Sequence, residues 1–361
     1  MHIKAPERVL KAINHEEPDR IPAFESAFTN YTIMRHYDID PTKGHGYYVT
    51  YEFFRKVGID LVLSYVSIFP RKSMKGGYID EYGRIMKTEY YKDGTIILTY
   101  HGGSFKSFDD YESWEKPDPF SEVRFNQFLL GREQQKKLKD EVFSIPATGS
   151  IFELAMEGFG LETFSRILAK PNHVKKVFDD HGKFTLEIVK ILAENDAQIV
   201  LLWDDYGFKK GLFMSPQNYR KYVFPWLTQV CDAAHKHNCK ILLHSDGDLL
   251  EIFEDLIKCG IDIINPLEPT TANPEYDIFK LNQKFGEKIT FSGNLNPVKL
   301  SMGNISEIEL DAKRLISELG PGGGYIFGSG HSIHPAVTLD RFEAMQNIRR
   351  KYGNYPINVP D

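Results

Sequence analysis

Residues 198–204 read Gln-Ile-Val-Leu-Leu-Trp-Asp, five apolar side chains in a row followed by a carboxylate. A strand that is apolar on both faces is typical of a parallel sheet covered by helices. In α/β barrel enzymes the loops that follow such strands form the active site. The stretch therefore predicts a buried parallel strand, and it directs attention to the polar residues that come after strands of this kind.

Seven further apolar runs flank this stretch, and longer segments with apolar residues three or four positions apart lie between them. The predicted strands are residues 21–25, 60–65, 143–148, 198–204, 239–244, 261–266, 289–292 and 324–329. The clearest predicted helices are residues 172–194, 216–237 and 248–259. Eight strands joined by helical crossovers predict an α/β fold, namely a closed (β/α)₈ TIM barrel that forms a single domain over residues 1–361.

Residues 78–103 interrupt this regular order. Polar and apolar side chains alternate there around the sequence Lys-Asp-Gly-Thr at 92–95, which indicates a tight turn between two antiparallel strands. We predict a β-hairpin insertion between the second and third barrel strands, close to the mouth of the barrel.

Composition narrows the class of protein. The 44 Lys and Arg against 50 Asp and Glu give a net charge of −6 without a basic stripe, so we expect no nucleic-acid partner. No run of 18 apolar residues exists and the first residues lack the apolar core of a signal peptide, so we expect no membrane association and a cytoplasmic location. Cys231, Cys239 and Cys259 form no Cys-x-x-Cys pair, and we interpret them as small buried residues.

Polar and ionisable residues follow almost every predicted strand, whereas the strand interiors are apolar. These residues are Glu25, Asp204, Asp205, His244, Asp246, Asp248, Asn265, Glu268, Ser292, Asn294, Ser329 and His331. Since the carboxyl ends of parallel barrel strands meet at one mouth, this asymmetry predicts an enzyme with its active site there. Each residue also has a structural alternative, such as an ion pair for Glu25 or a helix N-cap for Asp248.

His244 and Asp246 stand two residues apart at a strand end, so their side chains lean to the same side. This is the spacing of metal ligands, and His331 after the last strand completes a set of three nitrogen and oxygen donors. Such a set suits Zn²⁺ as well as other divalent cations. A hydrogen-bonded pocket histidine is the alternative for His244. Of the adjacent carboxylates, we expect Asp204 to cap a loop and Asp205 to face the pocket.

Several segments resemble the uroporphyrinogen decarboxylase superfamily over essentially the whole chain. They are residues 7–22, 204–207, 211–216, 244–248, 265–269 and 322–327. The resemblance implies a (β/α)₈ barrel, independently of the strand count. It also implies one of two chemistries, because the superfamily contains decarboxylases and cobalamin-dependent methyltransferases.

Two departures from the family patterns bear on the chemistry: the first argues against decarboxylation, and the second argues against a thiol as the substrate of a methyltransferase. The decarboxylases carry an early Arg-x-x-Gly-Arg-Tyr segment that grips substrate carboxylates, whereas residues 25–31 here read Glu-Ser-Ala-Phe-Thr-Asn-Tyr. The methyltransferases that act on thiols have His-x-Cys after strand five and a later Cys after strand eight. Asp246 and His331 stand at those positions here, which implies a harder, more Lewis-acidic ion suited to an ether or hydroxyl oxygen.

The leading hypothesis is a methyltransferase that moves a methyl group from a small-molecule donor, with aryl methyl ethers as the favoured class, to a corrinoid protein. The corrinoid is expected to come from a separate partner protein. The alternatives are a lyase resembling uroporphyrinogen decarboxylase, and a non-catalytic corrinoid- or tetrapyrrole-binding protein. The oligomeric state stays open between a monomer and a homodimer.

The residue roles follow from this hypothesis. One divalent cation, expected to be Zn²⁺, is held by His244, Asp246 and His331, with Glu153 or a water completing the shell. Glu153 or Asp205 acts as the general acid that protonates the leaving oxygen. The predicted substrate-binding residues are Glu25, Asn265 and Glu268.

Overall fold

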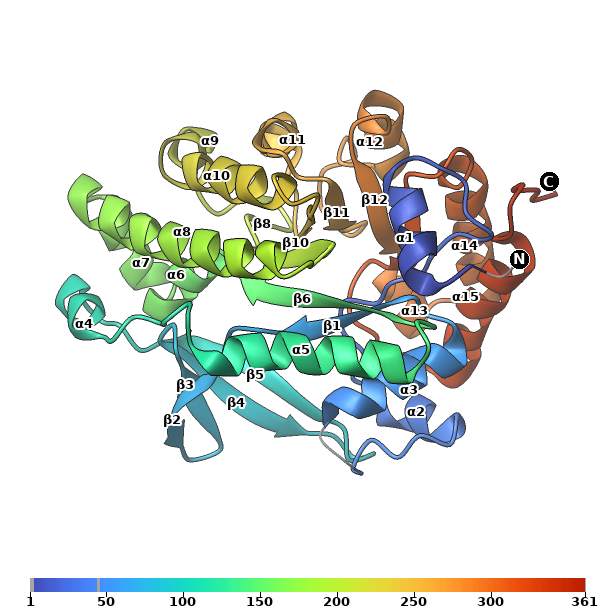
Figure 1. The fold of residues 1–361 in the computed structure, drawn as a ribbon, viewed down its shortest axis with the longest axis horizontal. Coiled ribbons are helices and arrows are strands. Elements are labelled where there is room, and N and C mark those ends of the chain that lie inside the picture. The colour runs from blue at the N-terminus through green and yellow to red at the C-terminus, as the bar shows by residue number, and fades with distance from the viewer. Residues whose placement is uncertain (1–2, 44–45, 361) are drawn as a thin grey trace.

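Seven of the eight predicted strands form one curled parallel sheet in which each strand lies beside the next along the chain (Figure 1). The computed structural model describes residues 3–43 and 46–360, without the side chains of residues 46–48. The strands, in order across the sheet, are β1 (Leu61–Tyr65), β6 (Phe143–Gly149), β7 (Ile199–Trp203), β10 (Lys240–Ser245), β11 (Ile263–Pro266), β12 (Thr290–Leu295) and β13 (Tyr325–Ser329).

The predicted first strand, residues 21–25, is reduced to two bridging residues that join the edges of this sheet. Ala23 pairs with Phe327 of β13, and Phe24 pairs with Leu61 of β1, both in parallel. A Cβ atom at Gly328 would clash with the carbonyl oxygen of Phe24, so this close approach requires glycine. The sheet therefore closes into a barrel with eight positions, which confirms the predicted (β/α)₈ fold class.

Asp60 holds the closing segment in place from the amino-terminal side of β1. Its buried carboxylate accepts a hydrogen bond from the Ala23 amide at 2.8 Å, and it pairs with Arg8 and Arg20, each at 2.8 Å. A second carboxylate, Asp19, contacts Arg8 at 2.6 Å. Because every charge in this network has an opposite partner, the network can stay buried beneath the barrel.

Helix α1 (Ala5–Ile13) covers the amino-terminal end of the barrel. Its residues Ala5, Val9 and Ile13 belong to the same core cluster as the inward-facing strand residues. Trp203, at the carboxyl end of β7, packs against this cluster. Side chains therefore fill the barrel from α1 to Trp203, and the functional end is the opposite, carboxyl-terminal mouth.

Helices cover the outside of the barrel strands, as Figure 1 shows for α5, α8, α10 and α12. The remaining helices are α2 (Tyr31–His36), α3 (Gly46–Val57), α4 (Phe108–Ser113), α5 (Glu122–Lys137), α6 (Glu153–Phe159), α7 (Leu161–Leu168), α8 (Pro171–Glu194), α9 (Pro216–Asn218), α10 (Phe224–His235), α11 (Phe253–Cys259), α12 (Ile278–Phe285), α13 (Pro297–Met302), α14 (Ile305–Leu319) and α15 (Leu339–Tyr352). A short two-stranded ribbon, β8 (Gly207–Phe208) and β9 (Gly211–Leu212), follows the fourth barrel strand.

Two predicted helices are less regular than expected. Residues 216–237 contain a π-helical turn at Tyr219–Val223, just before Pro225, which has no amide hydrogen to continue the α-helical pattern. Residues 248–259 begin with a 3₁₀ turn at Leu250–Ile252. Asp248 accepts a hydrogen bond from the Leu250 amide at 3.0 Å, but the N-cap residue of this turn is Leu249, so the predicted N-cap position of Asp248 is wrong by one residue.

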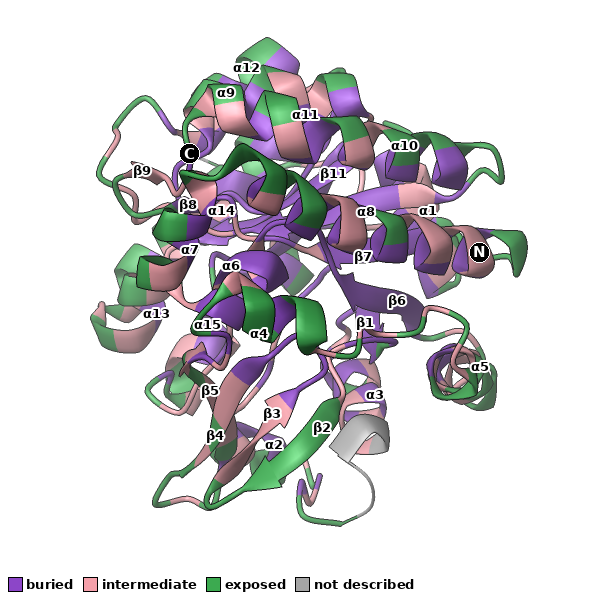
Figure 2. Cartoon of the chain, turned by 90° about the vertical axis from the view of Figure 1, so that its left-hand side faces the viewer, coloured by how far each residue is buried: buried purple, intermediate pink, exposed green. Residues whose placement is uncertain are grey.

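The insertion is larger than the predicted hairpin of residues 78–103. Four antiparallel strands form it, β2 (Pro70–Met74), β3 (Gly77–Asp80), β4 (Arg84–Tyr90) and β5 (Ile96–Gly103). The pair β4–β5 is the predicted hairpin, and β2–β3 extend it. The sequence of β2 is polar and fully exposed (Figure 2), so it lacks the alternation that would have revealed a strand.

Two smaller expectations are also resolved. Cys231, Cys239 and Cys259 are buried and free, as expected for small core residues. Within the described ranges, no helix has both the length and the apolar character needed to cross a bilayer.

Replacing Asp60 by alanine is expected to lower the free energy of unfolding by about 3–5 kcal/mol, because two arginines lose a buried partner and the Ala23 amide loses its acceptor. Urea denaturation followed by circular dichroism measures the loss. The control Glu162→Ala removes an exposed ion pair with Arg166 and is expected to cost less than about 1 kcal/mol. Losses of equal size in the two variants would contradict a special role for Asp60.

Candidate active site

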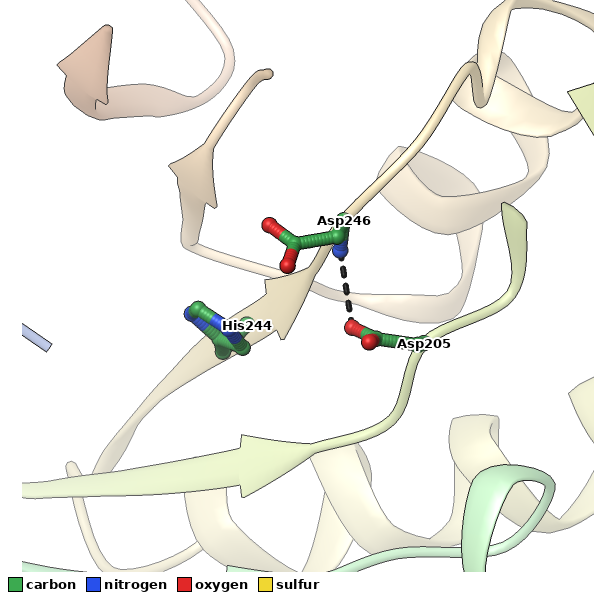
Figure 3. Close-up of side chains that lie close together, drawn as sticks. All are labelled: Asp205, His244 and Asp246. Atoms are coloured by element: carbon green, nitrogen blue, oxygen red, sulfur yellow. Dashed lines mark hydrogen bonds between the residues drawn. The ribbon is translucent and has the colours of Figure 1, made fainter. Parts of the chain in front are cut away.

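Three side chains from two neighbouring barrel strands converge at the mouth. Asp205 follows β7, while His244 and Asp246 lie at the end of β10 (Figure 3). One ligand-type atom from each lies within 4.8 Å of the other two. We refer to Asp205, His244 and Asp246 as the donor triad.

His244 is buried, and its orientation is fixed by Asn265 on the next strand. The Nδ1 atom of His244 lies 2.7 Å from Oδ1 of Asn265, and Nδ2 of Asn265 lies 3.4 Å from the carbonyl oxygen of Ser292. Because that carbonyl can only accept, Nδ2 must be the donor and Oδ1 must be the acceptor for His244. Nδ1 therefore carries a hydrogen, and in a neutral imidazole Nε2 then holds the lone pair that can bind a ligand.

The two carboxylates of the donor triad are joined through the backbone. The Asp246 amide donates a hydrogen bond of 2.8 Å to Oδ1 of Asp205. Oδ1 of Asp246 is buried and has no hydrogen-bond partner among the described residues. Burial, followed by the negative charges of Glu153 and Asp246, raises the pKa of Asp205. An orphaned carboxylate oxygen beside a second carboxylate and a free imidazole nitrogen fits a divalent cation.

Asp204 fixes the start of helix α6, which carries Glu153. Its buried carboxylate accepts the amides of Ile151, Phe152 and Glu153 at 2.7–3.0 Å. Burial raises the pKa of Asp204 to about 6, while these amide donors act in the opposite direction. Oε2 of Glu153 in turn accepts the Asp205 amide at 3.3 Å. The adjacent aspartates thus divide as the sequence predicts, with Asp204 capping and Asp205 at the mouth.

The inserted sheet supplies one buried cation to this acidic end of the barrel. Arg84 of β4 pairs with Asp80 at 2.7 Å and with Glu157 of α6 at 2.9 Å. Burial and the charge of Glu153 raise the pKa of Glu157 to about 7, although Arg84 opposes the rise. Arg84 thus contacts two carboxylates, and its ion pair with Glu157 joins α6 to the inserted sheet.

Glu268 and Gly247 shape the loop that carries Asp246. Oε2 of Glu268 accepts the Gly247 amide at 3.1 Å, and Oε1 accepts the hydroxyl of Thr270. Gly247 has φ +85°, and a Cβ atom there would clash with the Gly207 backbone. The contacts of Glu268 position Asp246, and its predicted substrate-binding role stays a prediction.

His331 lies at the same mouth but outside the donor triad. Its Nε2 atom is 3.7 Å from Oδ2 of Asp246, and half of its side chain is exposed. The structure therefore groups Asp205, rather than His331, with His244 and Asp246. As a ligand, His331 stays a prediction.

Glu25 is buried beside the last barrel strand. Its carboxyl group contacts the amide of Ser329 at 3.2 Å and the Ser329 hydroxyl. Burial raises the pKa of Glu25 to about 8, with the Ser329 hydrogen bonds and the charge of Arg349 opposing the rise. The raised pKa favours the protonated, neutral form of this carboxyl group at neutral pH.

The sequence reasoning missed three residues that shape the mouth. Trp203 packs edge-on against His244, with ring centroids 4.1 Å apart. Tyr65 of β1 stacks on Trp203, with ring centroids 6.3 Å apart and an angle of 11° between the ring planes. Glu157 stands four residues after Glu153 and so shares its face of α6. The position of Trp203 at a strand end and this spacing were the available signals.

The Glu25→Gln variant tests the protonation of this carboxyl group. Between pH 4.5 and about 8 the folded chain retains a proton that the unfolded chain has lost, so the stability of the wild type falls as the pH rises, by at most about 1.4 kcal/mol per pH unit. Glutamine lacks this loss, so the variant gains stability relative to the wild type across that window. Urea denaturation at several pH values measures the difference, with exposed Glu162→Gln as the control. A difference that does not change with pH would contradict the assignment.

Comparison with known proteins gives relatives named for a decarboxylase. The chain is 26% identical over 260 residues to uroporphyrinogen decarboxylase from Colwellia psychrerythraea, covering 67% of this chain and 69% of that one. It is 26% identical over 232 residues to uroporphyrinogen decarboxylase from Actinobacillus pleuropneumoniae, covering 61% of this chain and 62% of that one. The match thus spans about two thirds of the length of these relatives.

A solved structure described as a methyltransferase from Methanosarcina mazei superposes with a TM-score of 0.68. It covers 97% of this chain and 99% of that one at 18% identity, so the likeness concerns the fold. The sequence profile of the family described as uroporphyrinogen decarboxylase (URO-D) matches residues 91–352. Since this match covers most of the chain, the protein belongs to the uroporphyrinogen decarboxylase (URO-D) family.

Proposed function

We propose that this chain transfers a methyl group from a small donor, with aryl methyl ethers as the favoured class, to a corrinoid carried by a partner protein. The observation that supports this most is the donor triad, a set of one imidazole and two carboxylates without a thiolate, at the barrel mouth. Nitrogen and oxygen donors favour a hard ion that acts on an oxygen rather than on a thiol.

Asp205, His244 and Asp246 would hold the divalent cation, which we propose to be Zn²⁺. When bound, the ion would supply Lewis acidity that stabilises negative charge on the oxygen losing its methyl group. Asn265 keeps the free nitrogen of His244 in place, and Glu268 holds the loop of Asp246. These contacts would hold His244 and the loop of Asp246 in place before an ion binds.

The proposed reaction breaks the bond between the donor oxygen and its methyl carbon. The methyl carbon bonds to the reduced cobalt of the partner's corrinoid, which supplies the electron pair, and the oxygen takes up a proton. Since Asp205 would serve as a ligand, Glu153 is left as the general acid of the two predicted residues. Glu153 lies beside Asp205, and Glu157 behind it, with its pKa of about 7, can hold a proton.

Decarboxylation is the second candidate, because the curated relatives are named for it. The charges at the mouth favour it less. Glu153, Asp205 and Asp246 gather there, and the buried cation Arg84 already contacts two carboxylates. A substrate with many carboxylates would meet repulsion instead of ion pairs.

The metal assignment predicts that purified protein contains one divalent cation per chain, as measured by elemental analysis after zinc supplementation. His244→Ala is expected to abolish binding, and Asn265→Leu to weaken it about 10- to 100-fold, because the imidazole loses its orienting partner. Cys259→Ala is the control and should retain the wild-type metal content. Wild-type metal content in His244→Ala would contradict the donor triad as the site.

The activity prediction requires two proteins. Alone, this chain should release no product, whereas with reduced corrinoid protein it should demethylate a methoxylated arene and change the absorbance of the corrinoid. Glu153→Gln is expected to lower the rate of transfer about 100-fold at unchanged metal content, since it removes the proton donor. Carbon dioxide release from a uroporphyrinogen substrate, without methyl transfer from any ether, would support the decarboxylase candidate instead.

A further inference from the structure

A cavity of about 440 Å³ lies beside the barrel mouth, between the closing segment and strand β5 of the inserted sheet. Its walls are mostly apolar and include Phe28, Phe54, Val62, Ile96 and Leu98. None of its described lining residues is a lysine or an arginine. A volume of this size suits the ring and substituents of a small organic molecule.

Two wall residues from β5 are apolar yet exposed. Ile96 is 45% exposed and Leu98 is 48% exposed, and they alternate with Ile97 so that both lie on the same face of the strand. Both residues line the cavity, so their exposed surface faces a space that a ligand can fill. Covering such surface gains roughly 25 cal/mol per Å².

Glu25 is the acidic residue of the described cavity lining, and its contacts accommodate a neutral carboxyl group. The Ser329 hydroxyl lies within hydrogen-bond distance of Oε2 of Glu25 and also of the carbonyl oxygen of His331. A hydroxyl group has a single hydrogen and cannot donate to both acceptors. An arrangement in which Glu25 keeps its proton satisfies both contacts, because the carboxyl group then donates to the hydroxyl and the hydroxyl donates to the carbonyl. In that arrangement Glu25 brings no charge to the cavity.

A pair of stacked rings connects the cavity with the donor triad. Tyr65 lines the cavity and stacks on Trp203, and Trp203 packs against His244. A single indole ring thus separates the cavity wall from the imidazole of the triad. Tyr65 presents an aromatic ring to the cavity, and such a surface favours aromatic ligands.

We propose that this cavity binds the apolar ring of an uncharged substrate, and that Glu25, as a neutral carboxyl group, forms a hydrogen bond with a neutral polar substituent on that ring. The cavity is therefore selective for uncharged ligands over carboxylates. The identification of the ligand as the methyl donor rests on the proposed function; the binding site itself does not.

Binding to the full-length chain without any corrinoid protein tests this proposal. Isothermal titration at about pH 6.5 compares 2-methoxyphenol, which is uncharged, with 2-methoxybenzoate, which is anionic. The uncharged probe is expected to bind at least about 10-fold more tightly, because the anion would lose its hydration without gaining a cationic partner. Equal affinity for the two probes, or tighter binding of the anion, would overturn the proposal.

Variants locate the binding site. Leu98→Glu places a charge in the cavity wall and is expected to weaken binding of 2-methoxyphenol at least about 10-fold. The matched control is Leu310→Glu on α14, where Leu310 is 67% exposed and distant in the fold, and it should bind like the wild type. Identical affinities in these two variants would place the ligand elsewhere.

Glu25 is tested by two substitutions. Glu25→Gln keeps an uncharged group that donates and accepts hydrogen bonds, so its affinity should stay within about threefold of the wild type. Glu25→Leu removes the hydrogen bond and should weaken binding about 10-fold. If the leucine variant does not fold, the glutamine variant still decides, since a large loss there would contradict a neutral Glu25.

The outcomes separate this inference from the proposed function. Selective binding of 2-methoxyphenol without methyl transfer to any corrinoid protein would refute the function and leave the cavity supported. Methyl transfer that is insensitive to Leu98→Glu and Glu25→Leu would support the function and overturn the cavity as the donor site.

Discussion

Closure of the barrel by residues 21–25 is the constraint on which the functional end depends. Ala23 and Phe24 join the two edge strands, and the next residue, Glu25, is thereby placed against Ser329 at the mouth. Backbone hydrogen bonds join this segment to Phe327 of β13 and to Leu61 of β1, and the buried carboxylate of Asp60 accepts the Ala23 amide at the other end of the barrel. The segment of residues 21–25 therefore contacts the paired charges of Asp60 at the amino-terminal end of the barrel and places the carboxyl group of Glu25 at the mouth.

The mouth tolerates several carboxylates because each is held by different donors. Asp204 accepts amides at the start of α6, Asp205 accepts the amide of Asp246, and Glu268 accepts the amide of Gly247. Backbone amides stabilise the charged form without supplying a cation that would compete with a metal ion. Glu25 is stabilised differently, by keeping its proton. The result is an acidic cluster at the mouth and a cavity lined mostly by apolar residues beside it.

The sequence alone determined the fold class and the end of the barrel at which the polar residues gather. Apolar runs such as residues 198–204 can be satisfied only between two layers of helices, and the order of strands and helices leaves few topologies. Polar residues after the strands then had to meet at one mouth. The sequence also separated Asp204 from Asp205, because their roles depend on contacts between two neighbouring loops.

Only the tertiary structure decided which side chains come together. It grouped Asp205, rather than His331, with His244 and Asp246, because the distances across the mouth depend on the curvature of the sheet and on loop geometry. It also revealed the cavity, whose walls come from the closing segment, from β1 and from an inserted sheet whose first strand has no periodic pattern. Such a site depends on packing between elements far apart in the chain, and no local spacing of residues records that packing.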